Sequence, residues 1–237
     1  MFGMKWPVFV WILAASVAAV TQQAPTINLQ GRLELVDTTA TTAPPSALDV
    51  ALYSPDTFAM YRGQADQSGN FELKSVRPGH YVLQISVPSR LRTFTIAGRE
   101  MSPAGFELMA GEKGPVRIVL SMKTGTLSVD VQGAGDMKTA LIAILSPDDE
   151  NLTLRSQVSN PVSAGRTEFR YQPPGKYLLF VTDADLGGDL GTNAKLRDAL
   201  KERATRAEVF AEVDTRFAAS YIDRQTVEAA RRQVAPP

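Results

Sequence analysis

The sequence predicts an all-β protein built from two tandem β-sandwiches, with a short helical segment in the second sandwich and a short helix at the C-terminus. Three observations support this prediction. Short stretches of alternating apolar and polar residues are separated by turn-forming residues about every ten positions, which is typical of a β-sandwich. One such pattern occurs twice, beginning at Gly69 and again at Gly165. The chain has 237 residues, enough for two modules of roughly 100 residues each.

The N-terminus has the features of a secretory signal peptide. Lys5 supplies a positive charge, residues 6–20 form an uncharged apolar run, and small residues precede a cleavage site after Ala19. We therefore predict a signal peptide over residues 1–19 and export to the periplasm or the extracellular space. The alternative is a retained anchor, although the run is shorter than the roughly 20 residues that a bilayer-spanning helix needs. After cleavage we expect no stable membrane insertion.

Composition excludes several classes of function. The chain contains no cysteine, which excludes disulfides, thiolate catalysis and cysteine-ligated zinc. Its 25 Lys and Arg residues balance its 25 Asp and Glu residues, so charge gives no reason to expect a nucleic-acid partner. His80 is the single histidine, which excludes multi-histidine metal sites, and no nucleophile-elbow sequence accompanies it. We interpret His80 as a solvent-facing turn residue.

The repeated pattern is a strand, a tight turn and a second strand. It covers residues 69–83 and again 165–179, and a glycine, a Pro-Gly pair and a tyrosine recur at the same places. In the first copy Phe71 and Leu73 alternate with polar residues, which places both on one face of a strand. Residues 78–79 are Pro-Gly, which forms a tight turn because proline fixes one φ and glycine accepts a positive one.

The strands before this pattern repeat as well. Residues 31–35 resemble residues 125–129, and residues 51–55 resemble residues 143–147. One structural unit therefore occurs twice, with a very short joint at residues 122–124 that predicts contact between the two modules.

The remaining segments complete the two modules. We expect strands at 91–97 and 115–120 in the first module, with a turn at 98–100 and a polar loop at 38–45. In the second module we expect a helix over 193–204 that Asn193 caps, and then strands at 207–213 and 216–222 that both complete the second sheet. Asp223 is expected to cap a last helix that runs through Arg232, either as an exposed, frayed helix or as a docking helix. The predicted domains are 26–122, 125–222 and a C-terminal helix and tail over 223–237.

The combination of a turn, Gly-x-Phe and then Pro-Gly-x-Tyr before an apolar strand resembles the carboxypeptidase regulatory-like, or transthyretin-like and prealbumin-like, β-sandwich family. Tandem copies of this domain occur in exported bacterial proteins. The resemblance implies two immunoglobulin-like or transthyretin-like sandwiches over most of residues 27–222. Its motifs are structural and not catalytic, and related folds include carbohydrate-binding and cell-surface adhesive modules. The second copy departs from the pattern, because Thr167 replaces Phe71 and residues 160–164 replace the Asp-rich turn.

One acidic, Gly-rich segment is a candidate cation site. Within residues 182–193, Asp183, Asp185 and Asp189 supply the oxygen ligands that Ca²⁺ prefers. An EF-hand loop starting at Asp183 would, however, need a ligand where Gly187 stands and a glutamate where Ala194 stands. The competing interpretation is a solvated loop that leads into a helix, with no metal and no cofactor.

Three aromatic residues are candidate ligand-binding residues, namely Phe58, Tyr61 and Tyr171, because exposed rings often stack on sugars. The competing interpretation is core packing. Both tryptophans, Trp6 and Trp11, lie in the predicted signal peptide.

These observations predict an exported, non-enzymatic binding or scaffold protein with a protein or glycan partner at the cell envelope. One alternative is a carbohydrate-binding module, which an exposed pair of rings formed by Phe58 and Tyr61 would support. The other is a carboxylate- or metal-dependent hydrolase that uses the loop at 183–189. A cleft of clustered carboxylates with perturbed pKa values would favour the hydrolase. The acidic residues 148–151 are interpreted as a charged hairpin turn.

Overall fold

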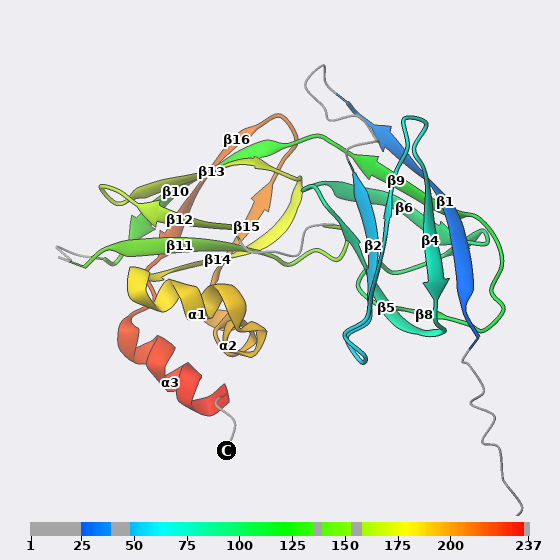
Figure 1. Cartoon of the computed structure of the whole chain (residues 1–237). Helices are drawn as coiled ribbons and strands as arrows, with labels where there is room; N and C mark the ends of the chain where they lie inside the picture. The colour runs from blue at the N-terminus through cyan, green and yellow to red at the C-terminus, as the bar shows by residue number, and fades with distance from the viewer. Residues whose placement is uncertain (1–24, 39–47, 135–138, 153–157, 235–237) are drawn as a thin grey trace, which may run out of the picture.

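The chain folds into two β-sandwich modules that lie side by side (Figure 1). The computed structural model describes residues 25–38, 48–134, 139–152 and 158–234. The predicted signal peptide at 1–19 and most of the predicted polar loop at 38–45 lie outside the described residues. The predicted all-β class, with a short helical segment in the second module and a short C-terminal helix, is confirmed.

Module 1 is a sandwich of two sheets with one core between them. The strand orders are β4-β1-β9-β6-β7 and β3-β2-β5-β8. Phe71, Leu73, Tyr81 and Leu83 all face this core, as their alternation with polar residues predicts. The strands are β1 (Ile27–Val36), β2 (Asp49–Tyr53), β3 (Met60–Gln64), β4 (Asn70–Val76), β5 (Gly79–Ile85), β6 (Arg90–Ile96), β7 (Arg99–Glu100), β8 (Phe106–Leu108) and β9 (Val116–Ser121).

Module 2 repeats this sandwich with two fewer strands and with added helices. Its sheets have the orders β13-β10-β16 and β12-β11-β14-β15. The strands are β10 (Gly125–Gln132), β11 (Leu141–Pro147), β12 (Val158–Val162), β13 (Arg166–Gln172), β14 (Gly175–Asp183), β15 (Thr205–Val209) and β16 (Asp214–Ser220). The helices are η2 (Ala184–Leu186), α1 (Gly187–Thr192), α2 (Ala194–Ala199), η3 (Lys201–Arg203) and α3 (Arg224–Val234).

The last two strands of module 2 lie in different sheets, so the prediction that they complete one sheet is wrong. β15 pairs antiparallel with β14, whereas β16 pairs parallel with β10. The connection over residues 210–213 therefore crosses from one sheet to the other and closes the sandwich. Alternation alone indicates a strand but not the sheet to which it belongs.

Two structural details confirm that the modules are copies of one unit. The Tyr81 hydroxyl donates to the carbonyl of Arg77, and the Tyr177 hydroxyl donates to the carbonyl of Pro173, at 2.7 Å in both cases. Each module also has a β-bulge where its first strand pairs with the strand before the Pro-Gly turn. The bulges contain Ser75 and Tyr171, whose φ values are +54° and +57°.

The pairing corrects the sequence alignment of β2 with β11. Leu52 pairs with Leu83, and Leu145 pairs with Leu179, so Leu52 corresponds to Leu145. The sequence similarity instead aligned residue 51 with residue 143, which is a slip of one residue. A slip of one exchanges the two faces of a strand, and Ala143 indeed faces the core of module 2.

The first strands are also offset from the sequence alignment, by an even number of residues. Leu29 pairs with Leu73, and Leu127 pairs with Phe169, so Leu29 corresponds to Leu127. The sequence similarity instead aligned residue 31 with residue 125. Because the difference is four residues, the faces assigned to both strands are unchanged.

A third layer, made of helices, covers the outer face of the β11-β14 sheet in module 2 (Figure 1). Along β14, Tyr177 and Leu179 face the sandwich core, whereas Leu178 and Phe180 face a second cluster with the helices. Both faces of β14 are therefore buried.

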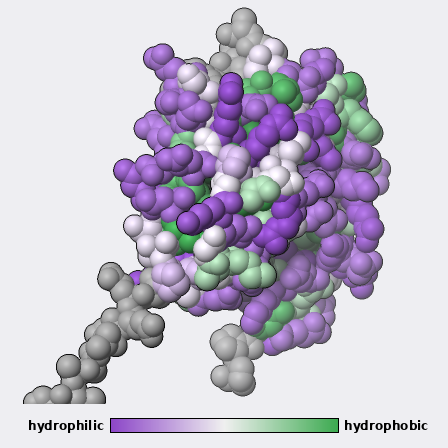
Figure 2. Space-filling view, turned by 90° about the vertical axis from the view of Figure 1, so that its right-hand side faces the viewer, coloured by the Kyte–Doolittle hydropathy of each residue, from purple (hydrophilic) through white to green (hydrophobic). Residues whose placement is uncertain are grey.

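Figure 2 shows the end of the molecule that module 1 forms. This surface is largely hydrophilic, with hydrophobic residues in separate small areas.

The acidic, Gly-rich segment is helical, so the interpretation of residues 182–193 as a solvated loop is wrong. Ala184–Leu186 and Gly187–Thr192 form two short helices directly after β14. Glycine is required at 187 because a Cβ there would lie 2.7 Å from Cγ2 of Ile142. Gly187 therefore permits close packing of α1 on the sheet.

The predicted helix caps are confirmed. Asn193 Oδ1 accepts from the Leu196 amide at 3.1 Å at the start of α2, and Asp223 Oδ1 accepts from the Thr226 amide at 2.9 Å at the start of α3. The helix α3 is not frayed and exposed, because Val227 is fully buried in the helix-covered cluster.

The two modules are joined by more than the short linker. Arg90 Nη1 donates to Asp149 Oδ2 at 2.6 Å and to the carbonyl of Pro174 at 2.7 Å. The Leu91 amide donates to the carbonyl of Asn151 at 2.7 Å. The side chains of Arg90 and Asp149 are 27% and 12% exposed, so this ion pair is largely shielded from water. The predicted contact between the modules is therefore confirmed.

Candidate functional site

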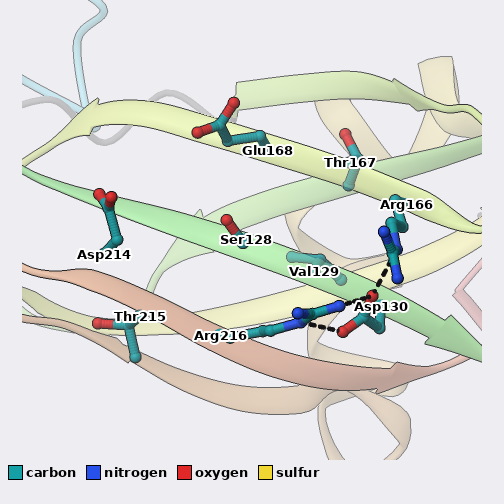
Figure 3. Close-up of a pocket in the computed structure, with 9 residues that line it drawn as sticks. All are labelled: Ser128, Val129, Asp130, Arg166, Thr167, Glu168, Asp214, Thr215 and Arg216. Carbon is teal, nitrogen blue, oxygen red and sulfur yellow. Dashed lines mark hydrogen bonds and ion pairs between the residues drawn. The ribbon is translucent and has the colours of Figure 1, made fainter.

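A shallow trough crosses the outer face of the β13-β10-β16 sheet in module 2 (Figure 3). Its volume is about 530 Å³. Side chains or backbone from all three strands line it, namely Ser128, Val129, Asp130, Arg166, Thr167, Glu168, Asp214, Thr215 and Arg216. We refer to this surface as the trough.

Strand alternation and side-chain length together create the trough. On the central strand β10, Leu127 and Val129 face the core, so Ser128 and Asp130 face outward. Ser128 pairs with Glu168 on β13 and with Arg216 on β16. A short side chain between two long ones leaves a depression along β10.

One end of the trough is fixed by a carboxylate that two arginines share. Asp130 accepts from Arg166 Nε at 3.0 Å and from Arg216 Nη2 at 2.9 Å, and Arg216 Nε makes a further short contact with it. The hydrogen bond from Arg216 is the main cause that lowers the pKa of Asp130, and the same bond raises the pKa of Arg216. These charge-assisted bonds hold all three side chains in place.

The other end of the trough carries two carboxylates and a third arginine. Arg170 Nη2 lies 2.7 Å from Glu168 Oε2, and its pKa is raised mainly by its hydrogen bond with Glu168, with a smaller effect from Asp214. The lining residues include three carboxylates and two arginines, and Arg170, which adjoins the trough through its ion pair with Glu168, supplies a third arginine. Its charges therefore balance.

The corresponding face of module 1 has longer side chains on its central strand. Because Leu29 corresponds to Leu127, Gln30 and Arg32 of β1 stand where module 2 has Ser128 and Asp130. Further along β1, Glu34 Oε2 accepts from Arg117 Nη2 at 2.9 Å across the face. Short side chains on the central strand are thus a feature of module 2.

The three acidic candidates for a calcium site each pair with an arginine. The Asp183 carboxylate is almost fully buried and accepts from Arg224 Nε at 3.0 Å, and Asp185 binds the same guanidinium at 2.6 Å. Asp189 pairs with Arg231. Within the part of the chain that the structure describes, no group of three or more metal-binding side chains gathers. Calcium binding stays a prediction, and it would require displacing these arginines.

The aromatic candidates lie in three different settings. Phe58 is 77% exposed, whereas Tyr61 is half-buried and packs edge-to-face on Tyr81 at 5.9 Å between ring centroids. Phe58 and Tyr61 therefore do not form an exposed pair of rings. Tyr171 is 74% exposed in the bulge of β13, directly after Arg170 and three residues beyond Glu168, which lines the trough.

Acid–base chemistry of the kind a hydrolase needs has little support in the carboxyl groups. Where the pKa of a described carboxyl group departs from its usual range it is lowered, as for Asp66 and Asp130, because hydrogen-bond donors favour the ionised form. A general acid needs the opposite shift. In the predicted acidic turn, Asp149 binds Arg90 and Asp148 accepts from Lys201 Nζ at 2.9 Å. His80 Nδ1 is 3.9 Å from a carboxylate oxygen of Asp56.

Sequence reasoning missed the trough and the ion pair between the modules. Asp130, Arg166 and Arg216 are ordinary surface residues on strands that are far apart in the sequence. The alternation of residues along β10 could have placed Ser128 and Asp130 on the outer face, but it does not indicate which residues of β13 and β16 lie beside them.

Comparisons with known proteins identify no family for this chain. No protein-family profile and no curated protein matches it. Among solved structures, it is similar to GBS52, a minor pilin of Streptococcus agalactiae, with 11% identity and a TM-score of 0.37 over 82% of this chain and 96% of the pilin. It is similar to the shaft pilin SpaA of Lactobacillus rhamnosus GG, with 12% identity and a TM-score of 0.25 over 83% of this chain and 98% of that one.

A third similarity is with the Bacillus anthracis TIE protein, with 14% identity and a TM-score of 0.29 over 84% of this chain. The match covers 34% of that protein, so this chain spans about a third of its length. The resemblance to the carboxypeptidase regulatory-like family stays a prediction.

Proposed function

We propose that this chain is an exported, non-enzymatic binding protein that contacts a partner at the cell envelope through the trough of module 2. In this proposal module 1 is a rigid support that the ion pair between Arg90 and Asp149 fixes to module 2. The single observation that carries the proposal is the trough itself, a concave polar surface whose charged side chains are already held in position.

The arrangement of charges supports binding more than catalysis. Asp130, Arg166 and Arg216 hold one another, so little side-chain freedom is lost when a ligand binds. The carboxyl groups whose pKa is perturbed are stabilised in their ionised form, which suits hydrogen-bond acceptors.

The export part of the proposal rests on the sequence. It includes the signal peptide at 1–19 and domains at 26–122 and 125–222, followed by the tail at 223–237. Among the described residues, no helix combines the length and the apolar character that crossing a membrane requires.

The proposal is tested by measuring saturable binding of the labelled chain without residues 1–19 to isolated bacterial envelope fragments. The variant Ser128→Arg fills the floor of the trough, and because its long side chain would occupy the space of the ligand, binding is expected to weaken at least about tenfold. A tenfold loss corresponds to about 1.4 kcal/mol of binding free energy. Gln30→Arg is the matched control, because Gln30 is the exposed residue at the corresponding position of module 1. Absence of saturable binding, or equal weakening by the two variants, contradicts the proposal.

A further inference from the structure

We propose that the ligand of the trough is a neutral oligosaccharide that lies along β10 with its hydroxyl groups bound by Ser128, Glu168 and Arg216. This inference rests on the proposed function and names the chemical class of the partner. Four observations carry it, namely the charge balance of the trough, the kind of groups that line it, their preorganisation and an exposed ring further along β13.

The charge balance favours a neutral ligand. Two arginines meet one carboxylate at the Asp130 end, whereas two carboxylates, Glu168 and Asp214, meet one arginine, Arg170, at the other end. A polyanion would be attracted to the arginines at the first end and repelled by the carboxylates at the second. A polycation would be repelled at the first end and attracted at the second. A neutral chain of hydroxyl groups satisfies both ends.

The lining chemistry suits hydroxyl groups and not an apolar peptide. Arg216 has the N–H groups of Nη1 in addition to the Nε and Nη2 groups that bind Asp130, and Glu168 has Oε1 in addition to the Oε2 that binds Arg170. Donors and acceptors of this kind suit hydroxyl groups, which both donate and accept. Val129 is the one apolar residue among the lining residues, and its side chain is buried in the core of module 2. The apolar surface of the trough therefore comes from the carbon atoms of its polar side chains, and not from an exposed apolar side chain.

Four charged side chains of the trough, those of Asp130, Arg166, Arg216 and Glu168, are held by ion pairs before any ligand arrives. Asp130 fixes the guanidinium groups of Arg166 and Arg216 from the floor, as Figure 3 shows. Because a sugar chain forms many weak hydrogen bonds, its affinity depends on not having to order the groups that bind it.

An exposed ring lies further along β13, three residues beyond Glu168, which lines the trough. Tyr171 follows Arg170 in the bulge of β13, with φ at +57° and 74% of its surface exposed. A bulky residue in this conformation is an outlier, and the corresponding residue of module 1 is Ser75, whose amide donates to Asn28 Oδ1 at 2.9 Å. The fold thus accepts a small residue at this bulge, and module 2 uses the position to present an aromatic face, on which the C–H face of a sugar stacks.

The test titrates the ¹⁵N-labelled chain without residues 1–19 with cellotetraose, maltotetraose and tetra-N-acetylchitotetraose. At least one of these is expected to bind with a dissociation constant below about 1 mM, which corresponds to −4.1 kcal/mol. The amide shifts are expected to centre on Ser128, Glu168 and Arg216. Tyr171→Ala is expected to weaken binding about tenfold, whereas Phe58→Ala, the matched exposed ring of module 1, is expected to leave it unchanged.

The outcomes separate this inference from the proposed function. If none of the neutral tetrasaccharides binds, or if only tetragalacturonate, a polyanion, binds, the inference is wrong. It is also wrong if Tyr171→Ala and Phe58→Ala behave alike. If envelope binding persists, is sensitive to Ser128→Arg and is destroyed by protease treatment of the envelope, the partner is a protein. In that case the proposed function holds and the oligosaccharide inference fails.

Discussion

The two modules share a framework, but the segment that follows β5 in module 1 and the segment that follows β14 in module 2 have different structures. In module 1 it forms β6 and β7, which extend the sheet that contains β9. In module 2 it forms the short helices η2, α1, α2 and η3, which cover the other sheet. One connection in a duplicated unit has thus been used to widen a sheet in one copy and to add a layer in the other.

The residues on the outer faces of β5 and β14 differ in burial, in agreement with this difference. On the outer face of β5, Val82 is half-buried and Gln84 is exposed, whereas Leu178 and Phe180, at the corresponding positions of β14, are buried under the helices. A sheet face that packs on one side alternates, and a strand that packs on both sides is apolar almost throughout. The apolar run of β14 therefore signals the third layer.

The largest effect is expected from breaking the helix-covered cluster. Phe180→Ala removes a fully buried ring between the sheet and the helices and is expected to destabilise the protein by about 3–5 kcal/mol. Gln84→Ala, the corresponding change in module 1, is expected to fall within about 0.5 kcal/mol. Urea unfolding followed by circular dichroism measures both, and similar costs for the two variants would contradict the two-sided burial of β14.

The joint between the modules is expected to give a smaller effect. Asp149→Ala leaves Arg90 largely shielded without its carboxylate and is expected to cost about 1.5–3 kcal/mol, the range for hydrogen bonds to charged groups. It is also expected to broaden the distance between spin labels at Lys74→Cys and Glu208→Cys, which the cysteine-free chain allows.

Glu202→Ala is the control for this prediction. It removes the ion pair between Glu202 and Arg206, whose side chains are 86% and 70% exposed, respectively. Little change in stability or in the distance distribution is expected. An unchanged distance distribution in Asp149→Ala would show that the linker alone sets the orientation of the modules.

The smallest effect is expected from titrating the paired tyrosines. Burial raises the pKa of Tyr81 to about 12, with a smaller contribution from Tyr61, and burial also raises the pKa of Tyr177, with a smaller contribution from Asp149. Since the neutral phenol is favoured in the folded state, this contribution to stability is complete below about pH 10 and is lost as the pH rises towards 12. Absorbance at 295 nm and circular dichroism recorded together measure it.

In that titration three phenols are expected to ionise late, namely Tyr81 and Tyr177 as the matched pair and Tyr221, whose pKa burial also raises to about 12. The double variant Tyr81→Phe with Tyr177→Phe should retain only the part of this late phase that belongs to Tyr221. Ionisation of all tyrosines near pH 10 with the circular dichroism unchanged would contradict the matched burial of the two rings.

Local chemistry made much of the fold predictable from the sequence. The Pro-Gly turns and the tyrosines recur because each module needs the same turn and the same buried hydroxyl, and the caps at Asn193 and Asp223 follow from their side chains. Long-range contacts decided what was missed. The helical character of residues 184–192 depends on α1 packing against Ile142, and the sheet to which β16 belongs depends on its pairing with β10.

The candidate site was less predictable than the fold. The trough depends on the short side chain of Ser128, which lies between the long side chains of Glu168 on β13 and Arg216 on β16. Each residue is common on a protein surface, so only the register between strands reveals the arrangement. The acidic segment at 183–189 drew attention because its residues are neighbours in the sequence, yet its carboxylates serve the packing of α1 and α3 through arginines.

The first and last strands of each sandwich lie side by side and run in the same direction, β1 with β9 and β10 with β16. A tensile force applied to the start of the first strand and the end of the last would slide one strand along the other. The backbone hydrogen bonds between them would then be loaded together in shear and not one after another, as in the opening of a zipper. The connectivity thus makes each sandwich a mechanically resistant link.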